Sequence, residues 1–141
     1  MVVNMNEFKN FGLSENIMKA LDSVGFTTPT EIQAKAIPML LANKKQDFHG
    51  QAQTGTGKTL AFGIPLIEKI DSSKKAVQAL IIAPTRELVL QIVESLTMLS
   101  KFYHGMQVEP IYGGVDMARQ TMALRRGVHI VVGTPGRLND H

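Results

Sequence analysis

Short apolar segments alternate with longer segments of helical periodicity along most of the chain. Strands that alternate with helices in this way form βαβ units, in which helices cover both faces of a parallel sheet. The sequence therefore predicts an α/β fold with a parallel sheet. We predict strands over about 47–52, 77–83, 107–112 and 128–132, and helices over about 58–70, 86–101 and 116–125.

The N-terminal part of the chain has a different pattern. Residues 14–24 carry apolar side chains at helical spacing, and Ser14 is placed to act as the N-cap of that helix. A second helix is predicted to begin near Thr30, because Thr30 and Gln33 have the spacing of a capping box. Pro38 is predicted to kink or restart it. These helices are expected to form an appendage to the sheet.

Composition limits the class of protein. A chain of 141 residues with 44% hydrophobic and 19% charged residues is long enough to bury a core as one domain. The absence of cysteine excludes disulfide frameworks, thiolate zinc sites and cysteine nucleophiles. The net charge of +3 permits contact with nucleic acid without requiring it. No apolar run reaches the roughly 18 residues that span a bilayer, and no signal peptide is visible, so we expect a cytoplasmic protein.

The segment AQTGTGKT lies between the first predicted strand and a helix, the context of a phosphate-binding P-loop. Its glycines let successive backbone N–H groups turn toward phosphate oxygens, and the helix amino end adds a positive dipole. Lys58 would reach the β- and γ-phosphates, and the Thr59 hydroxyl would bind Mg²⁺. The alternative is a flexible Gly-Thr turn before a lysine. The predicted nucleotide-binding residues are Ala52, Gln53, Thr54, Gly55, Thr56, Gly57, Lys58 and Thr59.

Two other patterns are set aside. Residues 43–47 (NKKQD) resemble the guanine-reading Asn-Lys-x-Asp sequence, but they have one residue too many and precede the P-loop, whereas a GTPase would place them after it. The four histidines lie far apart without ligand spacing, so surface or core positions explain them better than a metal site.

Several segments, in order, resemble the motifs of the first half of a DEAD-box RNA helicase. The resemblance runs from about Phe8 to Arg137, and in that family the P-loop motif begins with Ala, as it does here. The matching segments are 25–33 (GFTTPTEIQ, the Q motif), 52–59 (motif I), 84–88 (PTREL, motif Ia), 113–114 (the GG element) and 134–137 (TPGR, motif Ib).

This resemblance implies an incomplete RecA-like P-loop domain over residues 35–141, preceded by a Q-motif region over residues 6–34. It implies ATP and Mg²⁺ as cofactors, RNA as the partner, and a second RecA-like domain in the longer protein. Phe8, 17 residues before Gly25, would stack on the base, and Gln33 would bind adenine. The implied contacts to the RNA backbone are Pro84, Thr85, Arg86, Gly113, Gly114, Thr134, Pro135, Gly136 and Arg137.

Without the resemblance, simpler roles remain open for these residues. The Gln33 amide can pair with adenine N6 and N7, or it can close the capping box with Thr30. Phe8 can be a core anchor. Thr85 and Thr134 each follow a buried strand beside a proline, so we expect free N–H groups at the carboxyl edge of the sheet, where ligands bind. Plain helix capping is the alternative for both threonines.

The chemistry of hydrolysis is incomplete in these residues. A P-loop enzyme holds its magnesium with an acidic residue at the end of an apolar strand. None of the carboxylates after Thr59 directly follows such a strand, and the Asp-Glu-Ala-Asp sequence does not occur. We therefore expect the N-terminal part of an ATP-dependent RNA helicase, truncated at its C-terminal side and inactive as residues 1–141 alone. The alternatives are another P-loop ATPase, such as a small-molecule kinase, and a non-catalytic nucleotide- or RNA-binding module.

Overall fold

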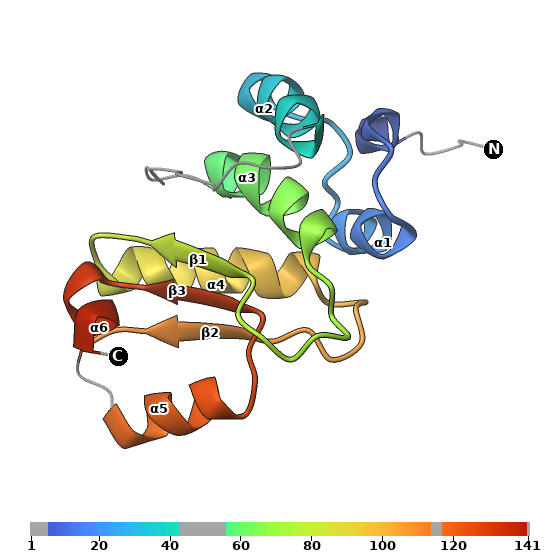
Figure 1. The fold of residues 1–141 in the computed structure, drawn as a ribbon. Coiled ribbons are helices and arrows are strands. Elements are labelled where there is room, and N and C mark those ends of the chain that lie inside the picture. The colour runs from blue at the N-terminus through green and yellow to red at the C-terminus, as the bar shows by residue number, and fades with distance from the viewer. Residues whose placement is uncertain (1–5, 43–55, 114–116, 141) are drawn as a thin grey trace.

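The computed structural model describes residues 6–42, 56–113 and 117–140 (Figure 1). The predicted strand over 47–52 lies outside these ranges. The described elements, in chain order, are η1 (Glu7–Phe11, a 3-10 helix), α1 (Glu15–Ser23), α2 (Glu31–Ala42), α3 (Thr56–Lys69), β1 (Ala79–Ile82), α4 (Arg86–Leu99), β2 (Val108–Ile111), α5 (Met117–Arg125), β3 (Ile130–Gly133) and α6 (Pro135–Asp140). None of the helices in the described part of the chain has the length and apolar character needed to cross a membrane.

The three described strands form one parallel sheet in the order β1-β3-β2. Ile82 of β1 and Ile111 of β2 both align with Gly133 of β3, so the strands end at the same level. Among the described strands β2 lies at the edge and pairs on one side, and a proline such as Pro110 is tolerated in a strand of that kind. The parallel sheet confirms the predicted α/β fold, and its aligned carboxyl ends present three consecutive loops at one edge.

The side chains of β3 alternate between two apolar clusters. Ile130 and Val132 belong to the large core with residues of α3 and α4, whereas Val131 packs with Ile111 and Leu124 in a smaller cluster. Successive side chains of a strand point to opposite faces of a sheet. Helix α4 therefore covers one face and α5 the other, as Figure 1 shows, which confirms helices on both faces.

The N-terminal helices follow the predicted pattern with one correction. Helix α2 continues through Pro38, so the predicted restart is wrong. The packing of α2 along α3 compensates for the loss of the backbone hydrogen bond that proline cannot donate. Ile32 of the same helix is exposed although it is apolar, because the buried stripe follows Gln33 and Ile37 and the neighbouring position points about 100° away.

The 3-10 helix η1 was not predicted. Its N-cap is Asn6, whose side-chain oxygen accepts from the Phe8 N–H at 3.0 Å. The Asn6 amide also donates to the Asp22 carboxylate at 2.6 Å and to the Phe26 carbonyl at 2.9 Å. The N-terminal segment is thereby fastened to the end of α1 and to the loop that follows it.

Candidate functional site

Helix α3 begins at Thr56, where the sequence predicts the helix that follows the P-loop. Lys58 and Thr59 lie in its first turn, with Lys58 exposed and Thr59 buried. Residues 52–55, the rest of the predicted loop, lie outside the described residues. The helix start has the position that phosphate binding requires, and the ligand roles of Lys58 and Thr59 stay predictions.

Gln33 forms the predicted capping box at the start of α2. Its Oε1 accepts from the Thr30 N–H at 2.9 Å, and its own N–H donates to the Thr30 hydroxyl at 3.4 Å. The side chain is 3% exposed. The capping role is thus confirmed. Because an amide oxygen has two lone pairs, the same side chain can also bind adenine, which stays a prediction.

Phe8 lies in the hydrophobic core. Its side chain is 1% exposed and packs edge-on against Phe11, with ring centroids 6.0 Å apart. This is the core-anchor position that the sequence also allowed. A base could stack on the Phe8 ring only if covering atoms moved aside, so base stacking stays a prediction that requires a local rearrangement.

The loop after β1 carries Pro84, Thr85 and Arg86, which are all exposed. Thr85 is the N-cap of α4, and its hydroxyl accepts from the Leu88 N–H at 3.2 Å, which confirms the capping alternative. The Arg86 guanidinium lies 5.9 Å from the centre of the Tyr112 ring, within cation–π range. Since Tyr112 directly follows β2, this contact joins the loops after β1 and β2.

The loop after β3 begins at Thr134, and its backbone differs from the expectation. The Thr134 N–H donates to the Ile111 carbonyl at 3.0 Å, so it is not free for a ligand. The reason is that the ladder between β3 and β2 continues one residue beyond the strand. Pro135 and Gly136, exposed in the first turn of α6, follow directly.

Two glycines leave open surface at this edge. A Cβ atom built on Gly113 or on Gly136 would meet no other atom within 4 Å. Neither residue has a positive φ, so the backbone conformation does not require glycine at either position. What the missing side chains provide is room for another molecule to approach the backbone. Gly114 lies outside the described residues.

Gln120 of α5 links two of the loops and was not singled out by the sequence. Its side chain is 2% exposed. The amide nitrogen donates to the Tyr112 carbonyl at 3.0 Å, and the amide oxygen accepts from Arg137 Nε at 3.0 Å. Together with the Arg86–Tyr112 contact, these bonds connect the loops after all three strands. A glutamine inside a helical segment gives no sequence signal of such a role.

No carboxylate directly follows a strand in the described residues: Ala83 follows β1, Tyr112 follows β2 and Thr134 follows β3. The described part of the chain also holds no group of three or more His, Asp or Glu side chains that could bind a metal ion.

Comparison with known proteins places the chain among helicases. Residues 30–141 match the family model described as DEAD/DEAH box helicase. The chain is 53% identical over 137 residues to a DEAD-box ATP-dependent RNA helicase CshA of Geobacillus kaustophilus, covering 97% of the chain and 29% of the relative. It is 53% identical over 134 residues to CshA of Bacillus subtilis, covering 95% of the chain and 26% of the relative. The chain therefore spans less than a third of these relatives.

Solved structures give the same result. A DEAD box protein of Methanococcus jannaschii matches with a TM-score of 0.84 and 42% identity, over 95% of this chain and 36% of that one. Saccharomyces cerevisiae Dbp5 bound to RNA and ADP BeF3 matches with a TM-score of 0.80 and 30% identity, over 96% of this chain and 33% of that one. The similarity thus extends to three-dimensional structure.

Proposed function

The chain belongs to the DEAD/DEAH box helicase family, and on this premise we propose that it forms the nucleotide- and RNA-binding part of an ATP-dependent RNA helicase. The proposal rests chiefly on one observation: the three loops that carry the implied RNA contacts meet at one edge of the sheet and are joined through Tyr112 and Gln120. Family membership removes the small-molecule kinase as an alternative. We assign residues 6–34 to a Q-motif region and 35–141 to a first RecA-like domain.

For the nucleotide, we propose ATP with Mg²⁺ at the amino end of α3. The fourteen-residue helix α3 has an exposed lysine and a buried hydroxyl in its first turn, which suit a phosphate and its metal ion. Lys58 would donate to the terminal phosphates, and the Thr59 hydroxyl would bind the metal ion. When bound, the metal ion would supply charge neutralisation of the phosphates, and the Thr59 hydroxyl would help to position it.

For the RNA, we propose contacts to the sugar-phosphate backbone without recognition of sequence. Arg86 and Arg137 supply positive charge, and the open surface at Gly113 and Gly136 admits the backbone of a strand. Contacts of this kind position a strand but carry no direct sequence information. A protein with such contacts can act on many different RNAs.

Nucleotide binding can be tested with Lys58→Ala in the full-length protein. Charge-assisted hydrogen bonds contribute roughly 1.5–3 kcal/mol each, so the affinity for an ATP analogue should fall about ten- to a hundredfold in calorimetric titration. Lys69→Ala, at the other end of the same helix, is the matched control and should bind normally. Unchanged affinity in Lys58→Ala would refute the assignment.

RNA binding can be tested separately with Arg137→Ala in the same protein. Single-stranded RNA of several sequences should bind more weakly to the variant by a similar factor, because a phosphate contact is lost whatever the bases are. Arg125→Ala, at the end of α5, removes the same charge and serves as the control. A loss confined to one RNA sequence would contradict backbone recognition.

A further inference from the structure

Arg86 has a preferred position although its side chain is exposed to solvent. It is the first residue of α4, and its guanidinium carbon lies 5.9 Å from the centre of the ring of Tyr112, the residue that directly follows β2. This distance is within the range of a cation–π interaction. The contact restrains a long side chain that would otherwise sample many rotamers.

The electrostatics at the start of α4 do not by themselves favour a cation there. The amino end of a helix carries partial positive charge, which is unfavourable for Arg86. Within the described ranges, Arg86 also has no carboxylate within 4.0 Å. The attraction that holds the guanidinium therefore comes from the electron-rich face of the Tyr112 ring.

Tyr112 itself is held firmly in the fold. Its side chain packs, partly buried, against the large core, and its backbone carbonyl accepts from the Gln120 side chain at 3.0 Å. Gln120 is in turn 2% exposed. Because both the ring and the backbone of Tyr112 are restrained, the guanidinium rests on a support that moves little.

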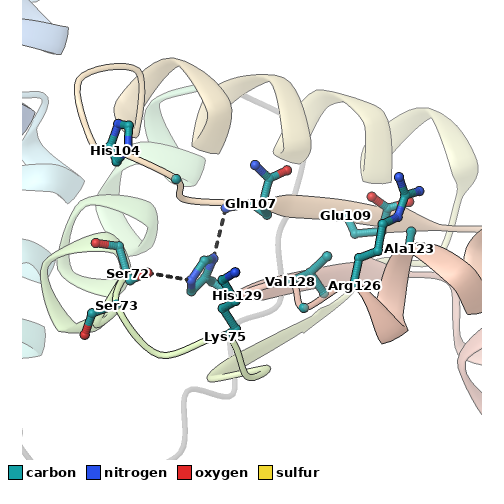
Figure 2. Close-up of a pocket in the computed structure, with 12 residues that line it drawn as sticks. Ser72, Ser73, Lys75, His104, Gln107, Glu109, Ala123, Arg126, Val128 and His129 are labelled. Carbon is teal, nitrogen blue, oxygen red and sulfur yellow. Dashed lines mark hydrogen bonds between the residues drawn. The ribbon is translucent and has the colours of Figure 1, made fainter.

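Arg126, at the opposite edge of the sheet, is in a different environment (Figure 2). It lies beside Glu109 of β2. Burial raises the pKa of the Glu109 carboxyl, and the positive charge of Arg126 opposes that shift. The charge of Arg126 thus interacts with a carboxylate of the protein, whereas the charge of Arg86 faces an aromatic ring and solvent.

We propose that Tyr112 is a positioning residue for RNA, which holds the Arg86 guanidinium ready to contact a backbone phosphate. The inference rests on the proposed RNA contacts of Arg86 and Gly113. A guanidinium that packs on an aromatic face keeps N–H groups at its edge to donate to a phosphate. Gly113 directly follows Tyr112 and leaves open surface, so a strand that approaches there passes close to Arg86. Since the side chain is ordered before RNA arrives, less conformational entropy is lost on binding.

The test is a fluorescence anisotropy titration of a labelled oligouridylate with the full-length protein at several salt concentrations. Arg86→Ala removes a phosphate contact, so the plot of log affinity against log salt should become shallower by about 0.7. Tyr112→Leu keeps that contact but releases the side chain, so the affinity should fall about two- to fivefold at every salt concentration, with the native slope. Tyr112→Phe keeps the ring and should restore native binding.

Two control variants make matched changes elsewhere. Arg126→Ala removes the same charge at the opposite edge of the sheet, and Tyr103→Leu removes the other tyrosine ring that packs against the large core. Both should keep the native affinity and slope. In the Arg86→Ala background, Tyr112→Leu should cause no further loss, because the side chain that Tyr112 positions is no longer there.

Three results would overturn the proposal: native affinity in Tyr112→Leu, equal weakening by Tyr112→Phe and Tyr112→Leu, or a further loss when Tyr112→Leu is added to Arg86→Ala. If one of these occurs while Arg86→Ala binds weakly with a shallower slope, the RNA contact of Arg86 stands and the role of Tyr112 is wrong. If Arg86→Ala binds RNA like the native protein, the proposed contact of Arg86 is wrong, and the role of Tyr112 falls with it.

Discussion

Replacing Gln120 with methionine tests the connection between the strand-end loops. Methionine has similar length and volume, so the substitution removes the hydrogen bonds to the Tyr112 carbonyl and to Arg137 without opening a large cavity. The Tyr112 carbonyl loses its bond from the glutamine amide, and Arg137 Nε loses its bond to the glutamine oxygen, each at 3.0 Å in the native protein. A neutral hydrogen bond contributes about 1 kcal/mol and one to a charged group about 1.5–3 kcal/mol. Because Arg137 is partly exposed, we expect a total loss of about 2–3 kcal/mol.

Urea unfolding followed by circular dichroism measures this loss. Gln107→Met is the matched control, since Gln107 is exposed and its variant should stay within about 0.5 kcal/mol of the native protein. Gln120→Glu separates the two bonds: its carboxylate still accepts from Arg137 but cannot donate to the Tyr112 carbonyl. We expect Gln120→Glu to lie between the native protein and Gln120→Met.

The same variants test whether Gln120 acts on RNA binding through Arg137. In a double-mutant cycle, Gln120→Met and Arg137→Ala should be non-additive, because both changes remove the same hydrogen bond between the two side chains. ATP affinity should change little. Stability of Gln120→Met within about 0.5 kcal/mol of the native protein, or additive effects on RNA affinity, would show that the buried amide does not hold these loops.

Three further predictions concern single residues. Gln33→Met should reduce the preference for ATP over GTP in competition binding, and equal affinities in the native protein would leave Gln33 as a helix cap only. Phe8→Ala should lower the free energy of unfolding by about 3–5 kcal/mol, while the exposed Phe102→Ala should cost far less; similar losses would contradict the core position. Burial raises the pKa of Glu109 above its ordinary value of 4.5, so the folded state disfavours its charge and Glu109→Gln should be more stable than the native protein at pH 7. Because of the raised pKa, the native protein becomes more stable relative to Glu109→Gln as the pH falls, so the stability difference between the two proteins should shrink toward pH 4.5. Thermal unfolding at several pH values measures this difference, and a difference that stays constant with pH would refute the reasoning.

Local sequence patterns predicted the elements that local forces define. The cap at Thr85 and the apolar spacing after it placed α4 correctly at its start, and the helix ended two residues before the predicted end. The strand expected over 128–132 occurs as Ile130–Gly133. Its bounds are shifted because strand ends depend on pairing with Ile82 and Ile111, which no local pattern specifies. Helix η1 is too short for periodicity to indicate it.

The contacts that join distant segments could not be predicted. Gln120 reaches Arg137 across 17 residues, and His129 reaches the Ser72 carbonyl across 57. Both are buried polar side chains whose partners are known only once the chain has folded. The sequence indicated the chemistry proposed for the P-loop because neighbouring residues supply it, whereas the arrangement of the loops proposed to contact RNA depends on packing between elements.

Tyr112 shows how few groups connect the three loops at the carboxyl edge. Its ring lies against Arg86, which belongs to the segment after β1. Its carbonyl accepts from Gln120, which in turn bonds to Arg137 in the segment after β3. Because β1, β3 and β2 end in register, these contacts span only the width of three adjacent strands. The cation–π contact at 5.9 Å is the weaker link, since Arg86 is exposed to solvent. The buried amide of Gln120 is the stronger one, and it therefore fixes the loop after β2, which carries Gly113, relative to helix α6, which carries Arg137.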